Sequence, residues 1–249
     1  MKKKAVLFDM DGVLVDVSQS YRLAVKQTAE RFLDREISLE VIQQYKNRGG
    51  LNNDWDLTEQ LLLDHGLKIG KEKIIAVFQQ FYKGENHNGL IRHEQWMIPR
   101  ETLAKVAWHF KTGIVTGRPR AEAMYTLKHF DMLSFFPVVI VMEDVPPGQG
   151  KPNPLGLRLA LEKLGAAGGW YLGDTIDDML AAKGAGLIPV GVVHNCSPGN
   201  PLMLTPCQPE VILRQAGALD VITDFTNAAA FFKQLAAVIG TPPRGAGEE

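Results

Sequence analysis

The sequence has little sulfur, little net charge and no long apolar stretch. Its 249 residues include two cysteines, Cys196 and Cys207, which are too few for a disulfide framework or a cysteine-based zinc site. The formal net charge is −1, which gives no electrostatic reason to expect nucleic acid or an anionic membrane as a partner. No apolar run could span a bilayer, and aspartates at 9, 11 and 16 interrupt any signal-peptide core. We therefore expect a cytoplasmic protein that binds neither nucleic acid nor membrane; its oligomeric state is left open.

The second part of the chain alternates short apolar runs with helical patterns. Strands are predicted at 5–8, 113–115, 138–142, 169–172, 188–193 and 219–222, and helices at 99–110, 120–130, 153–164, 177–183 and 226–238. Strands that alternate with helices favour a parallel sheet with helices on both faces. The predicted fold class is α/β, a three-layer Rossmann-like core. The apolar fraction of 45% is typical of a globular protein.

Residues 17–93 have a different pattern. Apolar residues recur at helical spacing over about 18–33, 38–45, 56–65 and 71–83, and no segment has the pattern of a strand. This predicts a small α-helical cap domain, residues 17–93, inserted into a discontinuous core domain of residues 1–16 and 94–249. A single continuous domain is the alternative.

The first strand ends in two closely spaced acids. The apolar run from Ala5 to Phe8 stops at Asp9, and Asp11 and Gly12 follow. Polar residues at the carboxyl end of a parallel strand lie where open α/β sheets have their active sites. Two carboxylates this close repel unless a cation lies between them, which favours a hard metal bound by oxygen. An acidic turn without a metal is the alternative.

Three later segments repeat this pattern of an apolar run followed by polar residues near a glycine. They are Thr116-Gly117-Arg118, the loop that leads to Lys151, and Gly173-Asp174-Thr175 with Asp178 four residues after Asp174. Each alone has an ordinary explanation: a turn, a surface loop, or a helix start capped by Asp174. The four together, in this order in an α/β pattern, are much more specific.

On these four motifs the chain resembles the haloacid-dehalogenase-like hydrolases, in the phosphoglycolate-phosphatase-like branch with a helical cap after the first strand. The resemblance implies that Asp9 is the nucleophile that forms an aspartyl-phosphate and that Asp11 is the general acid and base. It implies that Thr116 and the N–H of Gly117 hold phosphoryl oxygens and that Lys151 neutralises charge. The implied Mg²⁺ ligands are Asp9, the backbone carbonyl of Asp11, Asp174 and Asp178. An all-oxygen ligand set also favours Mg²⁺ over zinc.

The resemblance also bears on the reaction. Haloacid dehalogenases lack the second acid, so Asp11 argues against cleavage of a carbon–halogen bond. We expect a Mg²⁺-dependent phosphatase for a small phosphorylated metabolite. A phosphomutase of the same fold and a catalytically idle ligand-binding or regulatory protein are the alternatives. Arg118 departs from the commoner motif and is a candidate for binding a substrate anion; a surface arginine that opens a helix is the alternative.

Substrate specificity is expected in the cap. The loop from Gly49 to Trp55 offers Asn52 and Asn53 for hydroxyl recognition and Trp55 for stacking on an apolar or sugar face. Arg48 beside it could bind a carboxylate or a second phosphate. Alternatively, Asn52 to Asp54 cap the next helix and Trp55 packs in the core of the cap.

Overall fold

The computed structural model describes residues 3–46, 48, 50–51, 53–193 and 208–223. The chain divides into two compact units, one formed by Met1–Leu14 with Trp96–Glu249 and the other by Val15–Gln95. The two connections between the units pair as a two-stranded sheet of β2 (Val15–Asp16) and β3 (Gln95–Trp96). Among the described helices, none combines the length and the apolar character that crossing a membrane requires.

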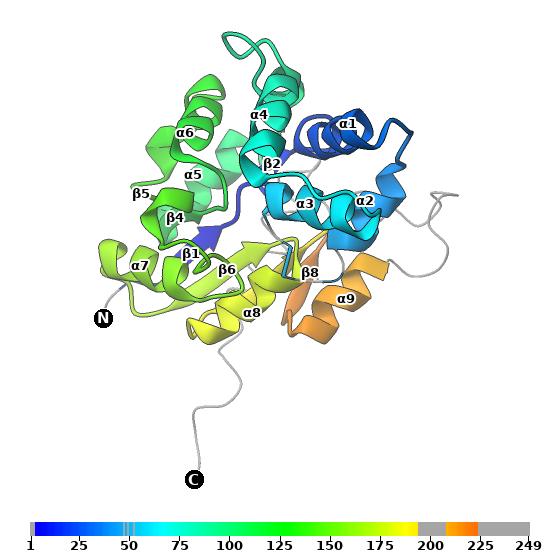
Figure 1. Ribbon diagram of the computed structural model, residues 1–249. Helices are drawn as coiled ribbons and strands as arrows, with labels where there is room; N and C mark the ends of the chain where they lie inside the picture. The colour runs from blue at the N-terminus through cyan, green and yellow to red at the C-terminus, as the bar shows by residue number, and fades with distance from the viewer. Residues whose placement is uncertain (1–2, 47, 49, 52, 194–207, 224–249) are drawn as a thin grey trace. The chain divides into compact units, whose positions relative to one another are not determined.

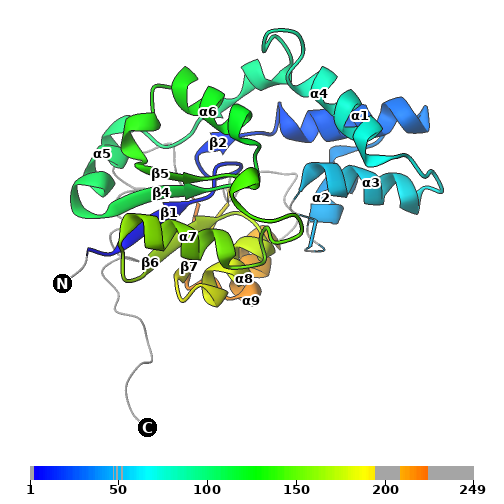
Figure 2. The same ribbon diagram turned by 60° about the vertical axis from the view of Figure 1, so that its left-hand side comes forward.

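The first unit is built on a parallel sheet, as predicted. Its order is β5-β4-β1-β6-β7-β8, and every described pairing is parallel. The strands are β1 (Ala5–Phe8), β4 (Lys111–Val115), β5 (Val138–Ile140), β6 (Gly169–Gly173), β7 (Ile188–Val192) and β8 (Asp220–Ile222). The helices between them are α5 (Arg100–His109), α6 (Arg120–His129), α7 (Leu155–Leu164), α8 (Ile176–Gly184) and α9 (Gln208–Ala216). Figures 1 and 2 show α5 and α6 on one face of the sheet and α7 and α8 on the other. The predicted α/β class and Rossmann-like sheet are confirmed.

Strand β1 lies at the centre of this sheet. All four of its residues are fully buried, because β4 and β6 flank it and helices cover both faces. Leu7 packs in a core cluster with Leu157 of α7 and Tyr171 of β6. The chain adds β4 and β5 on one side of β1 and then β6 to β8 on the other. Asp9 therefore follows the strand at which the direction of sheet growth reverses, where open α/β sheets bind ligands.

The second unit is mainly helical in its described part. It contains α1 (Tyr21–Leu33), α2 (Leu39–Lys46), α3 (Asp54–Asp64), α4 (Lys71–Tyr82) and the 3₁₀ turn η1 (Leu90–His93). Its core holds the rings of Tyr21 and Tyr82, which are tilted by 33° with centroids 4.1 Å apart, and Phe78 beside them. Buried Glu94 accepts hydrogen bonds from the hydroxyls of Ser20, at 3.3 Å, and Tyr82, at 2.9 Å.

Some predicted boundaries were wrong, and one helix was missed. Strand β5 ends at Ile140, and Met142–Asp144 form a 3₁₀ turn (η3) because the Asp144 carboxylate accepts a hydrogen bond from the N–H of Val141 at 2.9 Å. A further 3₁₀ turn, η2 (Leu133–Phe135), precedes β5. Helix α9 was not predicted. Both cysteines and the predicted helix 226–238 lie outside the described residues.

Candidate active site

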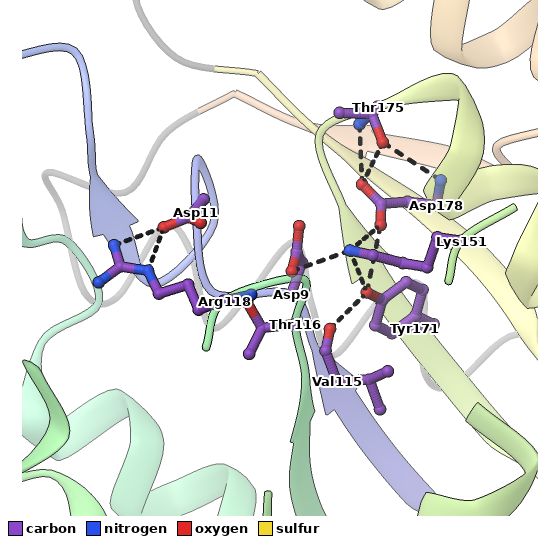
Figure 3. A network of polar contacts seen from close by, with 9 residues as sticks. All are labelled: Asp9, Asp11, Val115, Thr116, Arg118, Lys151, Tyr171, Thr175 and Asp178. Atoms are coloured by element: carbon purple, nitrogen blue, oxygen red, sulfur yellow. Dashed lines mark hydrogen bonds and ion pairs between the residues drawn. The ribbon is translucent and has the colours of Figure 1, made fainter. Parts of the chain in front are cut away.

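The carboxyl ends of the central strands bring four of the sequence motifs together. The register pairs Phe8 with Ile114 on one side and with Leu172 on the other. The residues that follow these three strands therefore lie at the same edge of the sheet. Asp9 is 4% exposed, and its N–H donates to the carbonyl of Leu172 at 2.8 Å. The polar residues around Asp9 are drawn in Figure 3.

Lys151 is the buried cation of the site. Its Nζ lies 2.9 Å from Oδ1 of Asp9 and 2.6 Å from Oδ1 of Asp178, and it donates to the Tyr171 hydroxyl at 3.1 Å. Burial alone would lower the pKa of Lys151, but Asp178 and Asp9 raise it well above its ordinary value. Lys151 is therefore a permanent positive charge beside Asp9.

One lysine does not balance the acids around it. Asp9, Asp174 and Asp178 each offer a carboxylate oxygen, and these atoms lie within 4.8 Å of one another. Burial raises the pKa of Asp9 well above its usual range, and the nearby carboxylates of Asp178, Asp174 and Asp11 raise it further, against the lowering effect of Lys151. The contact of Asp9 Oδ1 with Lys151 lacks the geometry of a hydrogen bond, so this oxygen can still accept a cation. The residues fit a hard divalent ion.

Two glycines let these carboxylates come so close. Gly12 has φ +71°, and a Cβ there would lie 2.1 Å from Oδ2 of Asp174. A Cβ on Gly173 would lie 2.2 Å from Cβ of Asp178. Side chains at 12 and 173 would therefore displace the acids, which explains why the strand ends carry glycine next to aspartate.

Asp11 contacts Arg118 instead of joining the acidic cluster with its side chain. Nε of Arg118 donates to Oδ1 of Asp11 at 2.6 Å, and Nη2 forms an ion pair with the same oxygen. Arg118 is 2% exposed, so the alternative of a surface arginine was wrong. α6 begins two residues later, at Arg120.

Thr116 and Gly117 lie at the end of β4. Thr116 is buried, its N–H donates to the carbonyl of Ile140 at 3.0 Å, and its Oγ1 accepts from the N–H of Arg118 at 3.2 Å. Gly117 is exposed. Their binding of phosphoryl oxygens stays a prediction.

The motifs did not reveal two residues of this site, Tyr171 and Thr175. The Tyr171 hydroxyl lies 2.9 Å from the carbonyl of Val115 and 3.2 Å from Oδ1 of Asp178. Thr175 caps α8, since its Oγ1 accepts from the N–H of Asp178 at 3.2 Å, and its own N–H donates to Oδ2 of Asp178 at 3.0 Å. Asp178 thus holds both Lys151 and the start of α8. The Thr-x-x-Asp spacing of a capping box, and a tyrosine inside a buried strand, were the available signals.

The residues predicted to bind substrate in the cap belong to the second unit. Asn53 caps α3, since its Oδ1 accepts from the N–H groups of Trp55 and Asp56 at 2.9 and 3.2 Å. Trp55 is half-buried and packs edge-on against Phe78, with centroids 6.4 Å apart. This arrangement is the one given above as the alternative to substrate binding.

Arg48 also has partners inside the second unit. Its guanidinium stacks over Tyr45 at 4.1 Å, and Nη1 lies 3.2 Å from Oδ2 of Asp64. The side chain is 55% exposed, and its binding of a substrate anion stays a prediction. Asn52 lies outside the described residues.

Comparison with known proteins shows the family of this chain. Residues 6–192 match the family described as haloacid dehalogenase-like hydrolase. The chain belongs to this family. The chain is 36% identical over 231 residues to an imidazoleglycerol-phosphate dehydratase of Phytophthora nicotianae. This match covers 88% of the chain but 50% of that protein. The chain therefore spans about half the length of this relative.

Two further relatives match over most of their length. A phosphoglycolate phosphatase of Vibrio cholerae is 26% identical, over 87% of this chain and 95% of that protein. The solved structure of a phosphatase from Thermococcus thioreducens has a TM-score of 0.56 and 27% identity, and the match covers 73% of this chain and 87% of that one. These similarities fit the resemblance seen in the four motifs.

Proposed function

We propose that this hydrolase is a Mg²⁺-dependent phosphatase that cleaves small phosphate monoesters through an aspartyl-phosphate on Asp9. One observation carries the proposal: a buried carboxylate, Asp9, lies 2.9 Å from a buried lysine, Lys151, and within 4.8 Å of two further carboxylates. This arrangement concentrates charge where a phosphoryl group would need a nucleophile, a fixed cation and a metal. Phosphoryl transfer depends mainly on such positioning and on compensation of charge at the equatorial oxygens.

In this proposal each residue has a separate task. Asp9 attacks phosphorus, and its ester is hydrolysed in a second step, which divides a difficult reaction into two easier ones. Asp11 gives a proton to the leaving oxygen and then takes one from the attacking water. Lys151, the Thr116 hydroxyl and the N–H of Gly117 contact phosphoryl oxygens. Asp9, Asp174, Asp178 and the carbonyl of Asp11 would hold Mg²⁺, which supplies charge neutralisation when bound.

The substrate class is a small organic phosphate. The Vibrio cholerae relative is named for phosphoglycolate. The Phytophthora relative is named for a dehydratase, a reaction outside hydrolase chemistry, and this chain matches only half of it. The matched half of that relative would be a phosphatase domain joined to a dehydratase. The product of the dehydratase keeps its phosphate group, and a phosphatase could then remove that group. We therefore add imidazole-bearing phosphate monoesters to phosphoglycolate and sugar phosphates as candidate substrates. Residues 17–93 are proposed to act as a cap that excludes water during attack.

The test is a phosphate-release assay over a panel of these esters, with Mg²⁺ and with a chelator. Asp9→Asn should reduce turnover by at least about 10⁴-fold, because the carboxylate that forms the covalent intermediate is gone. Asp131→Asn is the matched control, since Asp131 lies on the surface with its side chain 87% exposed. Retained turnover in Asp9→Asn would refute the mechanism.

The two alternatives give different results in the same panel. A phosphomutase would interconvert sugar-phosphate isomers without release of phosphate. An idle ligand-binding protein would show no Mg²⁺-dependent turnover of any ester, although the acids and the lysine are all in place.

A further inference from the structure

Arg118 is a buried arginine whose positive charge is paired with an acid of the same chain. Its guanidinium has no exposed surface, and a buried guanidinium needs a partner of opposite charge to offset the loss of water. Asp11, 107 residues earlier in the sequence, supplies that partner through Nε and Nη2. Figure 3 shows this pair on one side of Asp9 and Lys151 with Asp178 on the other.

The arginine is fixed on its far side as well. Nη1 donates to Oγ1 of Thr126, on α6, at 2.9 Å, and the carbonyl of Arg118 accepts from the N–H of Met142 at 3.0 Å. A planar guanidinium that is hydrogen-bonded through Nε and Nη1 and ion-paired through Nη2 has one orientation, which a lysine ammonium cannot reproduce because it is a single charged point.

The contacts to Asp11 are one-sided. Both go to Oδ1, which leaves Oδ2 of this side chain, 29% exposed, for another partner. A carboxyl group held through one oxygen has a fixed orientation, and its other oxygen stays available to another group.

We propose that Arg118 is a positioning residue that orients Asp11 for proton transfer to and from its Oδ2. The inference rests on the proposed phosphatase reaction. In the first step, Asp9 forms a bond to phosphorus, the bond from phosphorus to the leaving oxygen breaks, and the proton on Oδ2 moves to that oxygen, giving the free alcohol. In the second step, the oxygen of water forms a bond to phosphorus, the bond from phosphorus to the Asp9 oxygen breaks, and the proton of water moves to Oδ2 of Asp11, which gives free phosphate and the Asp9 carboxylate. Arg118 touches neither substrate nor water in either step.

The test uses the leaving group. An alkyl alkoxide is a poor leaving group and needs the proton, whereas p-nitrophenolate leaves without it. The parameter kcat/KM covers the steps up to departure of the alcohol and so isolates the first transfer. It is measured for p-nitrophenyl phosphate and for the faster of phosphoglycolate and glycerol 3-phosphate. General acid catalysis supplies roughly 10²–10⁴-fold, so Arg118→Lys should lower kcat/KM about 30-fold or more for the alkyl ester and about threefold or less for the aryl ester.

Three companion variants make the result specific. Arg120→Gln is the matched control, because Arg120 lies two residues away and its half-exposed side chain pairs with Asp144 at 2.6 Å. Thr126→Val removes the anchor of Nη1 and should shift the alkyl-to-aryl ratio in the same direction by a smaller factor. In an Asp11→Asn background, Arg118→Lys should not change the ratio further, since the residue it positions no longer carries the proton.

The outcomes separate this inference from the proposed function. A wild type without turnover of any ester, in this test or in the panel above, overturns both. A wild type that turns over, with Arg118→Lys lowering both esters in proportion or neither, overturns the positioning role alone. An effect of Arg118→Lys that persists in the Asp11→Asn background also overturns it. If Arg118→Lys does not fold, an unchanged ratio in Thr126→Val does the same.

Discussion

Gly12→Ala tests whether the turn after β1 needs a glycine because the carboxylate of Asp174 lies against it. The backbone at Gly12 has φ +71°, and a Cβ there would lie 2.1 Å from Oδ2 of Asp174. The left-handed conformation costs an alanine about 1–2 kcal/mol. Ordinary contact begins at 3.4 Å, so the Asp174 carboxylate would also have to retreat by about 1.3 Å, a displacement of the kind that costs on the order of 100-fold in rate.

Gly186→Ala separates these two effects. Gly186 has φ +72° and nothing within 4 Å of an added Cβ, so it carries the backbone cost without the displacement. Urea unfolding should show a loss of about 1–2 kcal/mol for both variants. A Mg²⁺ titration of phosphate release should show weaker Mg²⁺ dependence and about 100-fold lower turnover for Gly12→Ala alone. Equal turnover in the two variants would refute the assignment of Asp174 to the metal site.

Two further predictions concern protonation and packing at the same site. Because the pKa of Asp9 is raised well above 3.8, its proton stabilises the metal-free fold below 3.8, and this stabilisation is lost as pH rises through the folded-state pKa. Mg²⁺ binds the ionised form, so at 100 times its Kd, worth about 2.7 kcal/mol, it should raise the unfolding temperature more at pH 8 than at pH 5; equal gains would contradict this. Tyr171→Phe removes a buried hydroxyl 2.9 Å from the Val115 carbonyl and should cost about 1–2 kcal/mol in urea unfolding. Turnover should change little, because Asp9 and Asp178 still hold Lys151; loss of activity without loss of stability would be the contrary result.

The sheet and the strand ends were predictable because local sequence determines them. The run from Ala5 to Phe8 is continuously apolar, as a strand covered on both faces must be, and the acids begin where the strand does end. Helix α9 was missed, although Pro209 near its start and the pair of Glu210 and Arg214 at i,i+4 are helix signals.

Partners far apart in the sequence were not predictable. Arg118 was assigned to a substrate anion or to the surface because nothing near it indicates Asp11, 107 residues away. Asn53 could be either a ligand-binding or a capping residue, and only its contact with the N–H of Trp55 distinguishes the two. Tyr171 counted as one residue of a predicted strand, since nothing in the sequence indicates that its hydroxyl contacts Lys151, Asp178 and the carbonyl of Val115.

The central place of β1 has a consequence for how the chain folds. Ala5 pairs with Lys111 on one side and with Gly169 on the other. The strand that is synthesised first can therefore pair only after more than 100 further residues have been added. Until they arrive, an apolar strand with two unpaired edges is open to association with other chains. Loop-closure entropy grows only logarithmically, by about 0.6 kcal/mol per doubling of length, so the helical insertion between β1 and β4 adds little to this cost. The proposed active site therefore forms late, when the sheet closes around β1, and a nascent chain that stops before residue 169 lacks Asp174 and Asp178.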